Sequence, residues 1–369
     1  MSSNREGIYL LIGAALGIAL LSQGFKGNRS FEEAALGTLT VTHQAKSQVG
    51  EAIHTQRAKP EEIPSLLQHV EGKEERILIL GNSQTHSINQ KESGQTIYPE
   101  LLELGLDSTM GTLTHSLPNA NFQEFRVAHS WWSEKGPWDL ILVPAFMDDL
   151  REDGLRADFL KAPVAEGHQL DSKTTLSDAL NAQLDLLTHP PSDSGSESKE
   201  ETPQDIVERA LNDWLAEHTT TWKNRANARG DLFLSLYGLR NKAFGISAST
   251  QRKMIPARYN RNMSALAELL AHAEHKGQEV LLYIPPIRTD VAPPYDPQEY
   301  STFKEAIESL AAHHANTRFA NLENVVPGKY WGLKASTDGD GKPELDYMHF
   351  QFVGHQLLAE ALEREIRKP

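Results

Sequence analysis

The stretch Ile77-Leu78-Ile79-Leu80-Gly81-Asn82-Ser83-Gln84-Thr85 passes from an apolar segment directly into a polar turn. A short apolar run of this kind is typical of a strand buried on both faces of a sheet. Gly81 allows a sharp turn after that strand, and the polar residues behind it favour the start of a helix. In an open α/β sheet, ligands bind at this carboxyl edge of the strands. We therefore predict an α/β fold with Ser83 at its functional edge.

Other apolar runs predict the rest of the sheet. The five strands expected from them cover residues 77–80, 125–128, 140–143, 280–284 and 318–322. Apolar residues at helical spacing predict helices over residues 263–275 and in the last segment of the chain. Short apolar runs that alternate with helical patterns are typical of a parallel sheet with crossover helices. We expect a three-layer α/β/α sandwich around a mainly parallel, five-stranded sheet.

The N-terminus carries the longest apolar segment. Residues 8–21 are apolar or glycine without interruption, which approaches the 20 or so residues that a membrane span needs. No clear small-residue cleavage site follows the segment. We predict that residues 1–25 form an N-terminal transmembrane or signal-anchor helix that holds the catalytic domain at the cell membrane, outside the cytoplasm. Secretion after cleavage of a signal peptide is the alternative.

The rest of the chain divides by composition. Residues 26–75 are polar and predict a stalk. Residues 76–150 and 278–369 hold the strand and helix patterns of the α/β domain. Residues 151–277 predict a mostly helical insertion, in which residues 189–203 form an acidic loop too poor in apolar residues to fold alone.

Charge and composition exclude several classes of protein. The formal net charge of −14 argues against nucleic-acid binding, which requires a basic surface. The absence of cysteine excludes disulfides, thiolate catalysis and cysteine-ligated metal. Asp148, Asp149 and Asp153 with His129 match no established ligand spacing, so we predict no metal site. Nothing in the sequence indicates a cofactor, and the oligomeric state stays open.

A second motif lies near the C-terminus, where Asp346-Tyr347-Met348-His349 precedes the last helical pattern. A serine hydroxyl needs a base to remove its proton, and an imidazole needs a carboxylate to orient it. Ser83, His349 and Asp346 would supply these three groups. The alternatives are that the residues around Ser83 only cap a helix and that the Asp-x-x-His pair is a chance loop motif. His355 lies within the last helical pattern and is expected to serve in packing or capping.

With both motifs in this order, the chain resembles the SGNH/GDSL hydrolase superfamily over residues 76–150 and 278–367. The resemblance implies that Ser83 is the nucleophile, that His349 and Asp346 complete a triad, and that the Ser83 N–H contributes to the oxyanion hole.

Two features of that family are altered. A glycine that usually follows the second strand has no counterpart in residues 127–132, where Ser130 or His129 would take its place. The asparagine that follows the third strand is also missing, and Asp148 is the nearest residue in position. An ionised carboxylate repels an oxyanion, so Asp148 has another role, a donor such as Asn82 replaces it, or activity is low or lost. The oxyanion-hole candidates are therefore Ser83, Asn82, Ser130 and Asp148.

Three residues are candidates for binding the substrate. Arg151 and Arg288 follow strand ends, where a cation could hold an anionic group, although ion pairing within the protein would explain them equally well. Trp131 could stack on a sugar ring, and core packing is its alternative.

The anchor, the insertion and the altered third motif are similar to the membrane-anchored SGNH-like proteins of bacterial envelope polysaccharide O-acetylation. This resemblance implies an acyl-ester hydrolase or O-acyltransferase that acts on a cell-envelope or extracellular polysaccharide through an acyl-serine, with a membrane-bound acyltransferase as partner. The alternatives are a catalytically weak SGNH-like subunit that binds glycan or scaffolds an export or acylation complex, and a soluble lipase-like or thioesterase enzyme.

Overall fold

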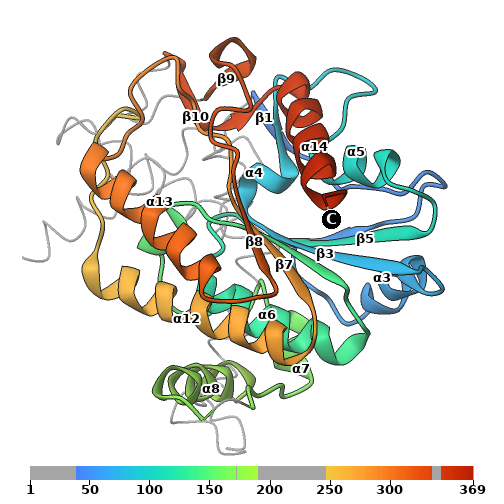
Figure 1. Cartoon of the computed structure of the whole chain (residues 1–369). Coiled ribbons are helices and arrows are strands. Elements are labelled where there is room, and N and C mark those ends of the chain that lie inside the picture. Colours follow the sequence, from blue (N-terminus) through green and yellow to red (C-terminus); the bar gives the residue numbers. More distant parts are fainter. Residues whose placement is uncertain (1–38, 172, 190–246, 335–341, 369) are drawn as a thin grey trace, which may run out of the picture. The chain divides into compact units, whose positions relative to one another are not determined.

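The computed structural model describes residues 39–171, 173–189, 247–334 and 342–368 (Figure 1). The elements discussed below belong to one unit, formed by Thr38–Pro191, Ala248–Lys334 and Pro343–Pro369. The predicted anchor over residues 1–25 lies outside the described residues. Within the part of the chain that is described, no helix is long and apolar enough to cross a membrane.

A six-stranded sheet forms the centre of this unit, with the strand order β2-β5-β3-β6-β7-β8 (Figure 1). All of its strand pairs are parallel, which confirms the predicted α/β class and the mainly parallel sheet. The strands are β2 (His54–Thr55), β3 (Glu75–Gly81), β5 (Met110–Ser116), β6 (Leu140–Pro144), β7 (Glu279–Ile284) and β8 (Thr317–Asn321).

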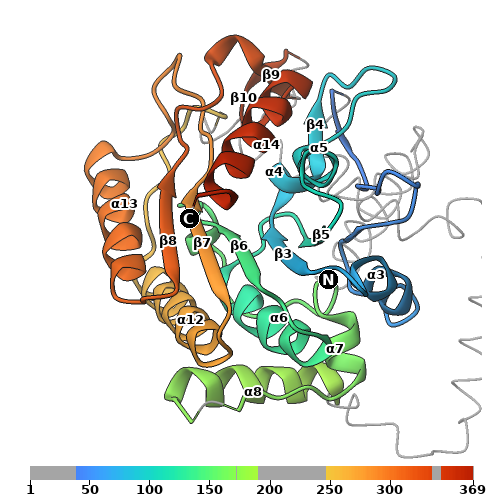
Figure 2. The ribbon, with the colours of Figure 1, turned by 45° about the vertical axis from the view of Figure 1, so that its right-hand side comes forward.

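Helices cover both faces of the sheet (Figure 2). Leu78 and Leu80 of β3 pack into a core with α3 (Ile63–Val70), α6 (Phe122–Lys135), α12 (Pro256–His275) and α13 (Pro297–Ala312). Ile77 and Ile79 point to the opposite face, where α5 (Tyr98–Gly105) and α14 (Phe352–Ile366) pack. Successive side chains of a strand alternate between faces, so the apolar run at 77–80 supplies both cores. The three-layer arrangement follows from this alternation.

One predicted strand is wrong. Residues 125–128 lie inside α6, whose start is set by a capping box between Asn121 and Glu124. The helix is buried around most of its circumference, so its continuous apolar run resembles a buried strand. The strand that actually precedes it, β5, alternates Thr and Ser with Gly, Leu and His and is almost entirely buried. Its polar side chains concealed it, and with the short β2 this makes six strands instead of five.

The predicted stalk also needs correction. Of residues 26–75, the described part from 39 onward packs into the domain. β1 (Thr40–Thr42) pairs with β4 (Ser87–Asn89), β2 extends the central sheet, and α3 covers β5. These elements are short, with three residues in β1, two in β2 and eight in α3, so the segment shows no sustained strand pattern in sequence.

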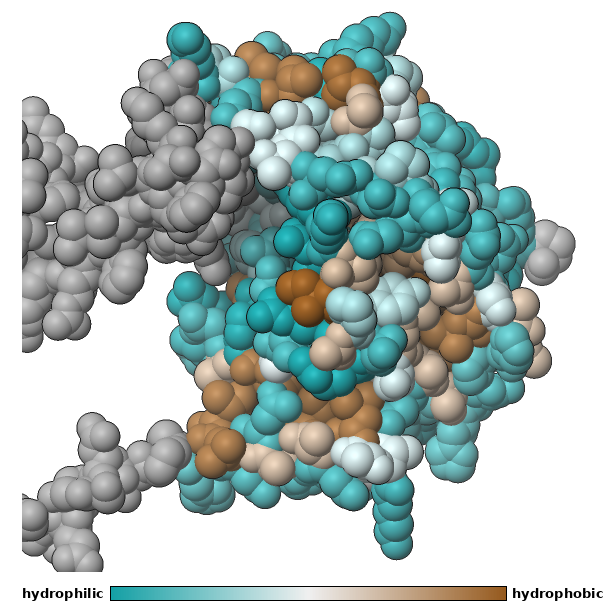
Figure 3. Space-filling model, turned by 90° about the vertical axis from the view of Figure 1, so that its left-hand side faces the viewer, coloured by the Kyte–Doolittle hydropathy of each residue, from teal (hydrophilic) through white to brown (hydrophobic). Residues whose placement is uncertain are grey.

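The predicted insertion, residues 151–277, contains α7 (Lys161–Ala165), α8 (Thr175–Thr188) and α12 in its described part. α12 packs on the sheet beside α6 and joins β6 to β7, so it is a crossover helix of the α/β domain rather than inserted material. Apart from His189, the predicted acidic loop 189–203 lies outside the described residues. The α12 and α13 side of the unit carries separate hydrophobic patches among hydrophilic residues (Figure 3).

Candidate active site

The turn that follows β3 positions Ser83. β3 ends at Gly81, and Ser83 is the first residue of the short helix α4 (Ser83–His86). The Asn82 side chain caps this helix by accepting the Gln84 N–H at 3.0 Å. A Cβ atom at Gly81 would lie 2.1 Å from Thr85 Oγ1, so only glycine fits at this point. The apolar strand and the polar cap therefore fix the serine at the carboxyl edge of the sheet.

The Asp-x-x-His motif lies in β10 (Glu344–Phe350), which pairs with β9 (Trp331–Lys334). The register of this pair shifts between Leu345 and Phe350. Within the irregular part, Asp346 Oδ1 accepts the backbone N–H groups of Met348 at 2.8 Å and His349 at 2.9 Å. In a regular strand, residues three apart face opposite sides. The local turn brings Asp346 and His349 to the same side.

The structure places these three side chains in one hydrogen-bonded chain. His349 Nε2 lies 3.0 Å from Ser83 Oγ, and His349 Nδ1 lies 3.0 Å from Asp346 Oδ2. A carboxylate accepts only, so Nδ1 carries the proton and Nε2 is free to accept the serine O–H. Ser83 and His349 are both buried, and each keeps 8% of its surface exposed to solvent.

Gln84 joins the two halves of the site. Its Nε2 donates to the carbonyl oxygen of Met348 at 2.9 Å and to that of Pro286 at 3.0 Å. The nucleophile turn is thereby held against both the β10 segment and the segment that follows β7. Sequence reasoning treated Gln84 as a turn residue and missed this role, because its partners lie more than 200 positions away.

Asp346 is held ionised. Burial opposes its ionisation, but the attraction of His349 and the hydrogen bonds from His349 and two backbone N–H groups outweigh burial and hold the pKa at about 2. Asn89 Nδ2 and Thr40 Oγ1 also approach Asp346 Oδ2, at 3.3 and 3.4 Å. Thr40 belongs to the segment predicted as a stalk, so that segment helps to build the site.

Arg288, a predicted substrate ligand, has partners within the protein. Its guanidinium makes a two-point ion pair with Asp290, at 2.8 and 3.1 Å. Nη1 donates to the carbonyl oxygens of Gly332 at 3.0 Å and Asp346 at 3.4 Å. Arg288 therefore braces the β9–β10 backbone behind the triad.

The remaining binding candidates also have other partners. Arg151 donates from Nε to the Lys253 carbonyl oxygen at 3.0 Å and contacts Asp148. Trp131 is fully buried in the core under α6, and its Nε1 donates to Glu166. The core-packing alternative therefore holds for Trp131.

Of the oxyanion candidates, Ser83 is the best placed, because the first N–H groups of a helix lack intrahelical acceptors. Asn82 Nδ2 is taken by Asp149 Oδ2 at 2.8 Å. Asp148 is bound by Arg252, by Tyr295 Oη at 3.1 Å and by Arg151. Ser130 is the ninth residue of α6 and lies about 12 Å along the helix from its start. Asn82, Asp148 and Ser130 are therefore not free donors at this site.

A neighbouring segment offers a further candidate for the second donor. Because β5 is the neighbour of β3, the segment after β5, residues 117–121, reaches the same sheet edge as Ser83. Within it, Asn119 is exposed and has a left-handed backbone with a φ of 54°. Asparagine tolerates this conformation better than most residues other than glycine. Sequence reasoning missed Asn119 because it missed β5.

Beneath the site, Ser116 Oγ lies between two histidines, 2.8 Å from His54 Nε2 and 2.7 Å from His86 Nδ1. Burial, reinforced by neighbouring positive charge, lowers the pKa of His54 to about 3 and that of His86 well below its usual value. His355 is also buried, and its Nδ1 accepts the Tyr98 N–H at 3.1 Å. These neutral histidines support the turn from below.

The acidic residues that follow β6 do not form a metal site with His129. His129 pairs with Gln278 at 2.9 Å and with His272, whereas Asp153 forms an ion pair with Arg261. Within the described ranges, no group of three or more potential ligands converges on one point.

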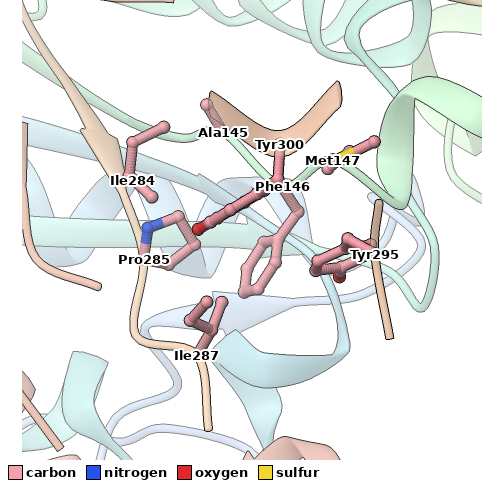
Figure 4. Close-up of a pocket in the computed structure, with 8 residues that line it drawn as sticks. All are labelled: Ala145, Phe146, Met147, Ile284, Pro285, Ile287, Tyr295 and Tyr300. Carbon is pink, nitrogen blue, oxygen red and sulfur yellow. The ribbon is translucent and has the colours of Figure 1, made fainter. Parts of the chain in front are cut away.

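A narrow, mainly apolar pocket lies at the carboxyl ends of β6 and β7, and it is packed too tightly to hold a water molecule (Figure 4). Pro285 and Ile287, on either side of the Pro286 that Gln84 binds, form one wall. Tyr295, whose hydroxyl donates to Asp148, forms another. The lining residues are Ala145, Phe146, Met147, Ile284, Pro285, Ile287, Tyr295 and Tyr300.

No protein-family model and no curated protein matches the chain. Among solved structures, the chain is similar to Axe2, an acetylxylan esterase from Geobacillus stearothermophilus, with 11% identity and a TM-score of 0.37 over 81% of this chain and 96% of that one. It is also similar to LAE5, an alpha/beta hydrolase from the metagenome of Lake Arreo, Spain, with 10% identity and a TM-score of 0.38 over 80% and 95%. At such low values, the function of this chain has to be argued from its own site.

Proposed function

We propose that this protein is a serine-dependent acyl-ester hydrolase or O-acyltransferase of the SGNH type. The observation that carries the proposal is the hydrogen-bonded chain from Ser83 through His349 to Asp346 at the carboxyl edge of the sheet. Two hydrogen bonds of 3.0 Å, a fixed imidazole tautomer and a buried, ionised carboxylate are what nucleophilic catalysis by serine requires.

In the first half of the reaction, Ser83 Oγ attacks the ester carbonyl carbon while its proton passes to His349 Nε2. The carbonyl oxygen becomes an oxyanion near the Ser83 N–H and the backbone of Asn119. Asp346 stabilises the imidazolium that forms, and stays ionised. The bond to the leaving alcohol then breaks, His349 returns the proton to that alcohol, and an acyl-serine remains.

In the second half, a hydroxyl group attacks the acyl-serine as His349 removes its proton. The bond between the acyl group and Ser83 Oγ then breaks, and His349 returns the proton to Ser83 Oγ. Water gives hydrolysis, and a sugar hydroxyl gives acyl transfer. A polysaccharide substrate, a location at the cell membrane through the N-terminal segment and a membrane-bound acyltransferase as partner complete the proposal, and they rest on the sequence alone.

The full-length protein tests this proposal with p-nitrophenyl acetate. We expect hydrolysis that Ser83→Ala reduces by about 10⁴-fold or more, because the nucleophile is lost. Ser65→Ala is a matched control, since Ser65 is an exposed serine on α3. Equal activity of the wild type and Ser83→Ala would contradict the proposal.

A second function, a catalytically weak subunit that binds glycan or scaffolds a complex, is favoured by one observation. Two carboxyl groups, Asp148 and Asp149, stand where the resembled family has an asparagine. If both were ionised, they would oppose an oxyanion. Inert wild-type protein that still binds an acetylated polysaccharide would support this second function.

A further inference from the structure

Asp149 contacts the nucleophile turn. It is the first residue of the short helix η1 (Asp149–Arg151), which follows β6, and it is only 2% exposed. Its Oδ2 accepts a hydrogen bond of 2.8 Å from the Nδ2 of Asn82, the residue directly before Ser83. No other described side chain donates to this carboxyl group. A buried carboxyl group with one neutral donor, next to a nucleophile, has no explanation in the triad itself.

The cations nearby are committed to other acids. Arg156 donates to both oxygens of Glu124, at 2.8 and 2.7 Å, and to the Pro118 carbonyl oxygen at 2.7 Å. Arg252 and Arg151 bind Asp148. The side chains of Asp148 and Glu152 add negative charge around Asp149.

An ionised Asp149 would therefore be a buried charge without a partner. Such a group gains free energy by keeping its proton. Burial raises its pKa well above the usual range, the negative charges of Asp148 and Glu152 raise it further, and the Asn82 hydrogen bond and the charge of Arg156 oppose this only in part. Asp149 is then a hydrogen-bond donor through the oxygen that Asn82 does not hold.

We propose that Asp149, as a neutral carboxylic acid, donates a hydrogen bond to the oxyanion formed when Ser83 attacks an ester. This inference rests on the proposed function and names a further catalytic residue for it. The proton stays on Asp149 throughout, so the two-step reaction balances as before. An asparagine at this place would donate through its amide, and the protonated acid supplies an equivalent O–H.

Two substitutions in the full-length protein test the proposal with p-nitrophenyl acetate. Asp149→Ala removes the donor, and we expect kcat to fall by about 10²- to 10³-fold. Asp149→Asn restores a donor and still accepts from Asn82, so we expect a loss of less than about tenfold. Asp153→Ala, which removes an acid paired with Arg261 farther along the same segment, is the control. If Asp149→Asn proves as inactive as Asp149→Ala, the proposal is overturned.

A spectroscopic measurement tests directly whether Asp149 keeps its proton, which donation to the oxyanion requires. The infrared difference spectrum between the wild type and Asp149→Asn at neutral pH should contain the carbonyl band of a protonated carboxylic acid. A carboxylate band in its place would overturn the proposal. Activity that survives in Ser83→Ala would instead refute the proposed function, so the two failures are distinguishable.

Discussion

The replacement Asp346→Asn probes the arrangement of the triad most sharply. Asp346 Oδ1 accepts two backbone N–H groups, so the amide oxygen of an asparagine would take that place. The amide nitrogen then faces His349 Nδ1, where Oδ2 now lies at 3.0 Å. An N–H donor at this place forces the imidazole into the other tautomer, with its proton on Nε2 and pointing at Ser83. That imidazole cannot accept the serine proton.

The size of the effect follows from this tautomer. Loss of the general base in a serine triad by the wrong tautomer costs about 10⁴ in kcat, or about 5 kcal/mol in the activation free energy. Stability should change less. The pKa of Asp346 is about 2 against an ordinary 3.8, so loss of the charge costs about 2 kcal/mol at neutral pH.

The assay is steady-state hydrolysis of p-nitrophenyl acetate by the full-length protein, together with thermal unfolding. Asp107→Asn is the matched control, because Asp107 is an exposed carboxylate far from the triad, paired with Arg367. We expect the control to stay within twofold of the wild type. A kcat for Asp346→Asn within tenfold of the wild type, at unchanged melting temperature, would refute this reasoning.

Three further predictions concern the fold and the pocket. Gly81→Ala should cost about 1–3 kcal/mol in unfolding free energy, because its Cβ would overlap the Thr85 side chain. Gly136→Ala is the control and should be tolerated, because the nearest atom to its Cβ would lie at 3.4 Å. Equal melting temperatures for the two variants would contradict this prediction. The pKa values of His54, His115, His129 and His355 are lowered to about 3, mainly by burial, so the unfolded chain takes up their protons below pH 6.5 and the folded chain does not. The free energy of unfolding should therefore fall by about 1.4 kcal/mol per histidine and pH unit as the pH drops below 6.5. Urea titrations that give the same free energy of unfolding at pH 7 and pH 5 would contradict this prediction. Ile287 is packed in the core beside this pocket, so Ile287→Ala should cost about 2–5 kcal/mol in unfolding free energy. An unchanged melting temperature would contradict close packing at this point.

Local sequence signals predicted most of the fold. The apolar runs of β3, β6 and β7 and the helical spacing of α12 and α14 arise from burial itself, which any sequence of this fold must satisfy. The sequence patterns failed at β5, which was missed, and at α6, which was predicted as a strand, and the reason is different there. The polar side chains of β5 are buried by tertiary contacts, and α6 is apolar around most of its surface, so neither segment shows its own period.

The site was predictable only where its parts have local signatures. Ser83 follows a strand and a glycine, and Asp346 and His349 are three residues apart, so short-range patterns exposed all three. The supporting residues have no such signature. Thr40 reaches Asp346 across 306 positions, and Gln84 reaches Met348 across 264. Asp148 and Asp149 are adjacent and chemically identical, and only the fold shows that the first pairs with arginines while the second contacts Asn82.

The most direct test of the account is to locate the site of covalent labelling by a fluorophosphonate. The full-length protein would be treated with the reagent, and the modified residue identified by mass spectrometry of its peptides. We predict a single adduct on Ser83 in the wild type, and its loss in His349→Ala, because the serine depends on that imidazole for its nucleophilicity. An adduct on another serine, or equal labelling of Ser83 in His349→Ala, would contradict the claim that Ser83, His349 and Asp346 act as one catalytic unit.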